Sequence, residues 1–253
     1  MQPVAQRGGR STDNAHLTAK LASTRYSSPN YDERAQAVSM LVLHYTGMDS
    51  AGSALERLCD PAAKVSAHYV VDEQGEVFNL VPEEKRAWHA GVSCWRGVLD
   101  INSASIGIEL VNGGHDFGLP PYPRVQIAAL ILLCQGILAR HQILPVNIVG
   151  HNEIAPDRKR DPGEHFAWAE LANAGIGVWP MAQAGTASVT NSAEQQAHQN
   201  LFDIGYAVPD ASHTQVLEFQ RRYRPALING VLDGETIDLI AQVKTLTQPD
   251  KPC

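Results

Sequence analysis

The chain has 253 residues, of which 44% are hydrophobic and 19% are charged, so it is long enough for one sizeable globular domain and a smaller one. Its formal net charge of -7 argues against nucleic acid as the main partner, because phosphate binding needs a basic face. No apolar stretch reaches the length of a membrane-spanning segment. The nearest, 125–138, is interrupted by Gln126, Gln135 and Gly136.

The first 35 residues (1–35) are polar and form a lead-in that we expect to be only partly ordered. They contain no apolar core of the kind that a secretory signal peptide needs. The four cysteines are scattered along the chain without a Cys-x-x-Cys pair, which argues against a thiolate zinc site. We therefore interpret Cys59 and Cys134 as small hydrophobic residues on helices.

The central part of the chain alternates strand-like and helix-like patterns. Strands are predicted for the short apolar or alternating segments 41–45, 67–72, 76–81, 105–111 and 145–150. Glu73-Gln74-Gly75 is typical of a hairpin turn. Helices are predicted for 51–58 after the capping residue Ser50, for 124–141 with Pro123 in its first turn, and for 166–174. This order predicts an α/β domain over residues 36–180.

The composition changes after residue 180. Residues 181–192 are mainly Ala, Gly, Ser, Thr and Gln, which is typical of a linker. Three short amphipathic segments follow, at 197–204, 214–223 and 236–243. They predict a small helical module over residues 193–248. Three short helices bury little surface, so we expect this module to be only marginally stable by itself.

Two histidines share one setting, each at the end of an apolar run. His44 follows Met40-Leu41-Val42-Leu43, and His151 follows a run that ends at Gly150. Asp161 lies ten residues further on, in a loop of two prolines and a glycine. Two neutral imidazoles and one carboxylate form a common catalytic zinc set, with a fourth position left for water. Such a site keeps a net charge of +1 and lowers the pKa of bound water to about 7.

Two further ionisable residues accompany this set. In 105–111, Ile106, Ile108 and Leu110 share one face of the predicted strand, whereas Gly107 and Glu109 share the other. A carboxylate in such apolar surroundings is costly unless it is paired or near a metal, and Gly107 would leave open space beside it. Lys159 has two interpretations, a solvated basic loop or an ammonium that stabilises an oxyanion, and its spacing does not choose between them.

Several known catalytic patterns are absent from the sequence. There is no His-Glu-x-x-His motif of helical zinc proteases, no Gly-x-Ser-x-Gly elbow and no Walker loop.

Five separate motifs, in order and with matching gaps, resemble the type 2 zinc N-acetylmuramoyl-L-alanine amidases, the AmpD/AmiD-like group. They are Val42-Leu43-His44-Tyr45-Thr46, Ser66-Ala67-His68-Tyr69, 86–91, 105–109 and 149–163. The resemblance covers roughly residues 38–180. It implies an α/β fold with a mixed central β-sheet flanked by helices, as in peptidoglycan recognition proteins, followed by the small C-terminal three-helix domain.

The resemblance also implies roles for individual residues. His44, His151 and Asp161 would bind one zinc ion per chain. Glu109 would be the general base that activates water, and Lys159 would stabilise the oxyanion. The substrate would be peptidoglycan or a soluble muropeptide, cut at the amide between the lactyl group of N-acetylmuramic acid and L-alanine.

Three more residues lie where related enzymes line the substrate groove: Trp88, His89 and Asn112. This part of the resemblance is weaker than the metal set. For Trp88 and Trp95, packing in the core is an equally good interpretation as contact with a sugar.

The C-terminal segment resembles a peptidoglycan-binding domain of the three-helix type. Its matching segments are 201–206, 218–223 and 230–236, with Thr236 as a candidate helix N-cap. Wall binding is the favoured function of this module, and plain structural support is the alternative.

One alternative to the enzyme is a non-catalytic peptidoglycan recognition protein on the same fold. Such proteins typically lack a metal ligand, whereas all three candidates are present here beside Glu109 and Lys159. The expected compartment depends on the C-terminal module, because wall binding is useful only where peptidoglycan is present. This favours the periplasm or cell envelope. The absence of a visible signal leaves the cytoplasm open, and no pattern indicates the oligomeric state.

Overall fold

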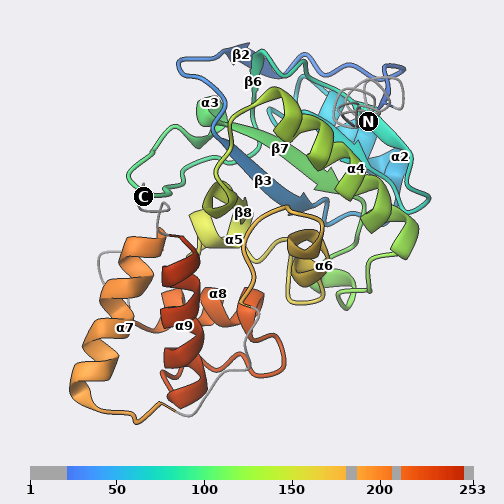
Figure 1. Cartoon of the computed structure of the whole chain (residues 1–253). Coiled ribbons are helices and arrows are strands. Elements are labelled where there is room, and N and C mark those ends of the chain that lie inside the picture. Colours follow the sequence, from blue (N-terminus) through green and yellow to red (C-terminus); the bar gives the residue numbers. More distant parts are fainter. Residues whose placement is uncertain (1–21, 181–186, 207–211, 248–253) are drawn as a thin grey trace, which may run out of the picture.

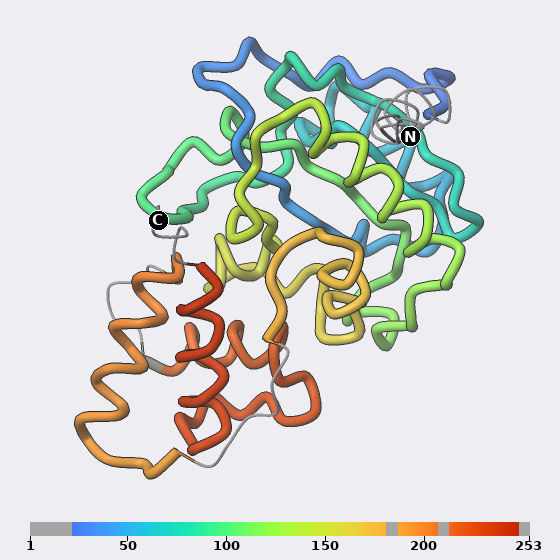
Figure 2. Tube along the Cα trace, viewed as in Figure 1, coloured from blue at the N-terminus to red at the C-terminus, as the bar shows by residue number. Residues whose placement is uncertain are grey.

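The computed structural model describes residues 22–180, 187–206 and 212–247 (Figure 1). Residues 1–21 of the predicted lead-in and 181–186 of the predicted linker lie outside the described residues. The described chain forms an α/β body and, beyond residue 187, three helices packed against one side of it (Figure 2).

The core of the α/β body is a mixed six-stranded sheet. Its strands lie in the order β1 (Ala22–Ser23), β5 (Val77–Asn79), β4 (Tyr69–Val71), β7 (Ser105–Leu110), β3 (Met40–Tyr45) and β8 (Ile148–Gly150). β4 and β5 are antiparallel and joined by the predicted turn, whereas every other neighbouring pair is parallel. The predicted mixed sheet is therefore confirmed, with β7 and β3 at its centre.

Helices cover both faces of this sheet, which is why its strands are apolar on both sides. The long helix α4 (Arg124–Arg140) packs with α6 (Trp168–Asn173) over one face, against Leu41, Ile106 and other side chains that point that way. Helix α2 (Ala51–Cys59) packs over the opposite face of β4 and β5. Among the described helices, none is both long and apolar enough to cross a membrane.

Local sequence signals account for the ends of these helices. Ser50 caps α2 through its side-chain oxygen, which accepts the backbone N–H of Ser53, as predicted. Pro123 is the N-cap of α4 rather than a residue of its first turn. Cys59 ends α2 and Cys134 is buried in α4, so their interpretation as small hydrophobic helix residues is confirmed.

Several short elements were not predicted. Residues 22–33, expected in the lead-in, supply β1 and also β2 (Tyr31–Glu33), which pairs with β6 (Lys85–Ala87). All three residues of β2 are exposed, and their side chains form ion pairs with β6 rather than apolar contacts, so β2 has no hydrophobic pattern. A four-residue helix, α3 (Ile101–Ala104), precedes β7 and was also missed.

The segment around His151 is more ordered than expected. The predicted strand 145–150 begins with a 3-10 turn, η2 (Pro145–Asn147), and only β8 remains of it. The loop predicted after Gly150 instead opens with a short helix, α5 (His151–Ile154). The Glu153 carboxylate closes this turn by accepting the backbone N–H of Gly150 at 2.7 Å. Hydrophobic periodicity does not reveal such a local side-chain hydrogen bond, so the sequence pattern did not predict this helix.

The three expected C-terminal helices are present and each is longer than predicted: α7 (Asn191–Ile204), α8 (Ser212–Tyr223) and α9 (Gly234–Leu246). The N-cap of α9 is Asp233 and not Thr236, because the Asp233 side chain accepts the backbone N–H of Thr236 at 3.0 Å. α7 and α9 lie side by side, and α8 lies next to α5 of the α/β body (Figure 1). We call residues 187–206 and 212–247 the helical module.

Candidate metal centre

Three potential metal ligands converge at one edge of the sheet. His44 lies near the end of β3, and His151 directly follows β8, which pairs with β3 so that Leu43 faces Gly150. Asp161 comes from the loop after α5. Its Oδ2 atom lies 2.9 Å from His44 Nδ1 and 3.1 Å from His151 Nδ1, and the two Nδ1 atoms are 3.0 Å apart. All three side chains are buried.

A chain of hydrogen bonds fixes the tautomer of His44. The Ser105 hydroxyl donates to the Ile101 carbonyl at 2.6 Å, so its oxygen accepts from His89 Nε2 at 3.2 Å. The other nitrogen of His89 then accepts from His44 Nε2 at 3.1 Å. This leaves Nδ1 of His44 with a free lone pair.

His151 is oriented in the same way by the backbone. Its Nε2 donates to the carbonyl of Ala90 at 3.0 Å, so its Nδ1 is also an acceptor. Burial, followed by the effect of His151, lowers the pKa of His44 to about 4, which keeps its ring neutral. Burial alone would raise the pKa of Asp161, but His151 and His44 together lower it, so the carboxylate is ionised.

With both rings in these tautomers, three acceptor atoms face one another at about 3 Å. Such an arrangement is repulsive by itself and becomes stable around a cation, because each lone pair can then be a metal–ligand bond. Two imidazole nitrogens and one carboxylate oxygen form a donor set that suits zinc. These residues therefore fit a divalent metal ion.

Glu109 and Lys159 line the same pocket, which has a volume of about 310 Å³. Glu109 lies on β7 directly opposite His44 of β3. One of its carboxylate oxygens is buried and has no hydrogen-bond partner within the described residues. Burial, followed by the charge of Asp161, raises the pKa of Glu109 well above its usual value. An unpaired, basic carboxylate in a pocket is suited to accept a proton.

Lys159 approaches the pocket from the loop between α5 and Asp161. Its side chain is half-buried, and no hydrogen bond or ion pair of its ammonium is found within the described part of the chain. Arg158 beside it donates instead to the carbonyls of Ala90 and Val92, so the two neighbouring cations have different environments. The pocket location favours the functional interpretation of Lys159 over a solvated loop.

The expectation of open space at Gly107 is wrong. A Cβ atom added there would lie 2.4 Å from the His89 ring, which fills this position. His89 is thus a buried neighbour of His44 on the inner wall of the pocket. A hydrogen on Gly107 is what lets the ring approach the sheet so closely.

Trp88 and Asn112 occupy other places. The Trp88 indole donates to Asp32 at 2.7 Å, and this side chain does not line the pocket of His44. Asn112 lines a neighbouring groove, but its amide is used within its own loop, donating to the Pro120 carbonyl and accepting from Gly114. Trp95 is fully buried, so core packing is the correct interpretation for this residue.

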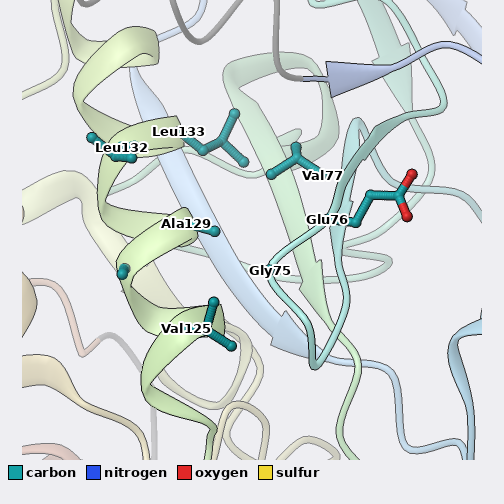
Figure 3. A pocket seen from close by; sticks show the side chains of 8 residues that line it. Gly75, Glu76, Val77, Val125, Ala129, Leu132 and Leu133 are labelled. Atoms are coloured by element: carbon teal, nitrogen blue, oxygen red, sulfur yellow. The ribbon is translucent and has the colours of Figure 1, made fainter.

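A second, apolar pocket lies between α4 and the hairpin of β4 and β5 (Figure 3). Its lining is Val77, Val125, Leu132, Leu133 and neighbouring small residues, and it contains none of the residues of the metal centre. Its single ionisable residue, Glu76, points its carboxylate away from α4 in Figure 3. The polar pocket at His44, by contrast, brings the three candidate metal ligands together with Glu109 and Lys159.

The sequence comparisons agree with this geometry. The family model for N-acetylmuramoyl-L-alanine amidase (Amidase_2) matches residues 34–164. N-acetylmuramoyl-L-alanine amidase AmiD of Escherichia coli K12 is 41% identical over 222 residues, which are 79% of this chain and 79% of AmiD. The chain belongs to this amidase family.

Solved structures of related amidases share the whole architecture. The complex of Escherichia coli AmiD with its substrate anhydro-N-acetylmuramic acid-L-Ala-D-γ-Glu-L-Lys superposes with a TM-score of 0.75 at 35% identity. The match covers 89% of this chain and 93% of AmiD. AmpDh3 of Pseudomonas aeruginosa gives a TM-score of 0.73 at 31% identity, over 98% of this chain and 99% of that one. Both matches extend beyond the α/β body, which ends near residue 180.

Sequence reasoning missed the residues behind the ligands. Ser105 was interpreted only as the start of a strand, and His89 as a groove residue, yet together they hold the tautomer of His44. No spacing rule connects them, because Ser105 and His89 meet only when β7 and the preceding loop pack together. Nothing in the pattern of 151–154 indicated the role of Glu153 either.

Proposed function

We propose that this amidase hydrolyses the bond between the lactyl group of N-acetylmuramic acid and L-alanine, with zinc held by His44, His151 and Asp161. The observation that carries the proposal is the unpaired, buried carboxylate of Glu109 in the same pocket as the three ligands. A protein that only binds peptidoglycan has no need for such a group, whose burial costs stability. This favours the enzyme over the binding protein.

Each residue has a distinct task. Zinc, when bound, acts as a Lewis acid and makes water a nucleophile at neutral pH. Glu109 takes the proton from the attacking water, and its raised pKa suits a general base that later returns the proton to the leaving amine. The Lys159 ammonium stabilises the negative charge that forms on the carbonyl oxygen. His89 and Ser105 keep His44 in the tautomer that binds metal.

The substrate proposed here is peptidoglycan or a soluble muropeptide. The structures of AmiD with an anhydro-muramyl tripeptide and of AmpDh3 with an anhydromuramic pentapeptide support it, because those are similar chains bound to such molecules. Met48 lines both the pocket at His44 and a second groove, which also carries the exposed Phe117 and offers room for a larger ligand.

The decisive experiment supplies both kinds of substrate to the purified protein. It is incubated with sacculi and with anhydro-muropeptides, with and without a chelator, and the products are identified by mass. We expect release of a peptide with a free L-alanine amine, loss of the reaction with chelator and its return with zinc. Tight binding of intact substrate without cleavage by the zinc-loaded protein would support the recognition protein instead.

For the helical module we propose peptidoglycan binding, and with it a place in the cell envelope. Its solvent-exposed surface carries apolar residues, including Phe202 of α7, which is 61% exposed, and Leu246 of α9, which is 47% exposed. The test is a pull-down of the full chain with insoluble wall. Phe202→Ala should weaken retention while hydrolysis of soluble muropeptides stays unchanged, and equal retention would reject this role.

A further inference from the structure

The short helix α5 is held from the side of the helical module. Its first residue is the ligand His151, and the three that follow are all buried at the boundary with the module. Ile154 packs in one hydrophobic cluster with side chains of α7, α8 and α9. Asn152 and Glu153 make polar contacts across the same boundary.

Glu153 is the centre of these contacts. One oxygen accepts from the Tyr206 hydroxyl at 2.6 Å, and the other accepts from Arg222 Nη1 at 2.8 Å and from the backbone of Gly150 at 2.7 Å. The side chains of Glu153 and Arg222 are only 1% and 3% exposed. Arg222 also donates to the Ile148 carbonyl of β8 at 3.0 Å.

Asn152 extends the same support to the third ligand. Its side-chain amide donates to Glu218 of α8 at 2.7 Å, while its backbone N–H donates to the carbonyl of Asp161 at 2.9 Å. Arg221, next to Arg222, donates to the same oxygen of Glu218 at 2.9 Å. The turn that carries His151 and is tied to Asp161 is therefore gripped by three module residues: Tyr206, Glu218 and Arg222.

We propose that the helical module is a positioning element of the metal centre, in which Arg222 and Tyr206 hold α5 through Glu153 and thereby set the position of His151. The proposal takes zinc from the proposed function, but it concerns assembly of the ligands and not turnover. It also differs from wall binding, because it uses the inner face of the module and not its solvent-exposed surface.

The physical reason is the precision that a metal site needs. Ligand atoms must lie within about 0.5 Å of their productive positions, which requires their supporting residues to be locked in place. α5 is only four residues long, too short to be rigid without tertiary contacts. Loss of a group that orients a ligand typically lowers metal affinity on the order of 10–100-fold.

The test measures the affinity of the full-length, metal-free protein for Zn²⁺ by competition with a chromophoric chelator. Arg222→Gln should weaken zinc binding on the order of 10–100-fold. Tyr206→Phe removes one hydroxyl from a buried site without changing its shape, so it should fold normally. Its affinity for Zn²⁺ should fall about tenfold, as expected for the loss of one hydrogen bond to a charged group. Far-UV circular dichroism checks that each variant is folded.

Arg224→Gln is the matched control. Arg224 lies two residues beyond Arg222 and pairs with Asp233 at 2.8 Å and Glu235 at 2.6 Å, inside the module. As long as circular dichroism shows the module folded, loss of Arg224 should leave zinc affinity unchanged, because its ion pairs are with module residues and not with α5. If folded Tyr206→Phe binds zinc as tightly as wild type, the positioning role is wrong, whatever Arg222→Gln does. Failure of the wild-type protein to bind Zn²⁺ would contradict the proposed function as well.

Discussion

Two buried glutamates near the candidate metal ligands are accommodated in opposite ways. Glu109, in the pocket, has a carboxylate oxygen without a partner in the described structure, and its pKa is raised well above normal by burial and then by Asp161. Glu153, at the boundary with the helical module, has both oxygens hydrogen-bonded and faces the guanidinium of Arg222. Both lie in the α/β body, Glu109 on β7 and Glu153 in α5, and both are buried.

The different pairing of the two carboxylates indicates different roles, one toward a bound ligand and one in holding the fold together. An unpaired buried carboxylate lowers the stability of the fold, and such groups are therefore found mainly at functional sites, where they act on a ligand. A fully paired one holds elements together, and removing its partner leaves an uncompensated charge. The same substitution, Glu→Gln, should therefore have different consequences at the two positions.

The largest effect is expected for Glu109→Gln. Loss of the proposed general base should lower the rate of muramyl peptide hydrolysis on the order of 10²–10⁴-fold. Unfolding by urea should show no loss of stability, because the amide is cheaper to bury than a carboxylate. Zinc affinity should be retained. Unchanged turnover would mean that another group accepts the proton.

Glu153→Gln should show the reverse pattern in stability. Arg222 would remain as a buried charge without its partner, which costs about 3–5 kcal/mol. The free energy of unfolding, from urea titration of the zinc-loaded full chain, measures this loss. A control is Glu33→Gln, which breaks the exposed pair with Lys85 and should cost much less stability, because solvent screens such a pair. Equal losses of stability in the two variants would show that the Glu153–Arg222 pair does not hold α5 to the module.

Gly107→Ala tests the wall behind Glu109. The added methyl group would meet the His89 ring and push it away from His44, which should cost about 1–3 kcal/mol of stability and also weaken zinc binding. Gly52→Ala is the control, because open space surrounds Gly52 on α2 and alanine favours the helix. Wild-type zinc affinity in Gly107→Ala would show that His89 does not orient His44.

The smallest effect concerns a third glutamate, Glu83, away from the metal ligands. Burial alone would raise the pKa of Glu83, but hydrogen bonds from Arg140, His141 and Tyr69 lower it from 4.5 to about 2. A lowered folded-state pKa gives stability that is present above pH 4.5 and is lost as the pH falls toward 2.

This shift predicts how stability depends on pH. The advantage of wild type over Glu83→Gln in unfolding free energy should shrink by about 2 kcal/mol between pH 6 and pH 3. Urea titrations of both proteins at the two pH values measure it, and the comparison cancels the other acidic groups. A constant difference would show that Glu83 forms no pair of this kind.

Local sequence patterns were sufficient for the elements that carry the site. The apolar run of β3 and the alternation of β7 follow from burial on two covered faces, and they correctly place His44 at a strand end and Glu109 on the face away from Ile106 and Ile108. The length of α4 and the ends of α2 follow from apolar content and capping. These are properties of residues close together in the chain.

Tertiary structure alone decided which polar groups meet. Glu153 and Arg222 are 69 positions apart, and the chain from His44 through His89 to Ser105 joins three segments whose spacing obeys no rule. A buried polar group accepts any partner of suitable chemistry, so its own sequence neighbourhood does not specify which one it finds. Glu153 and Arg222 are paired because the helical module packs on α5. The hydrophobic periodicity of the two segments does not predict this contact.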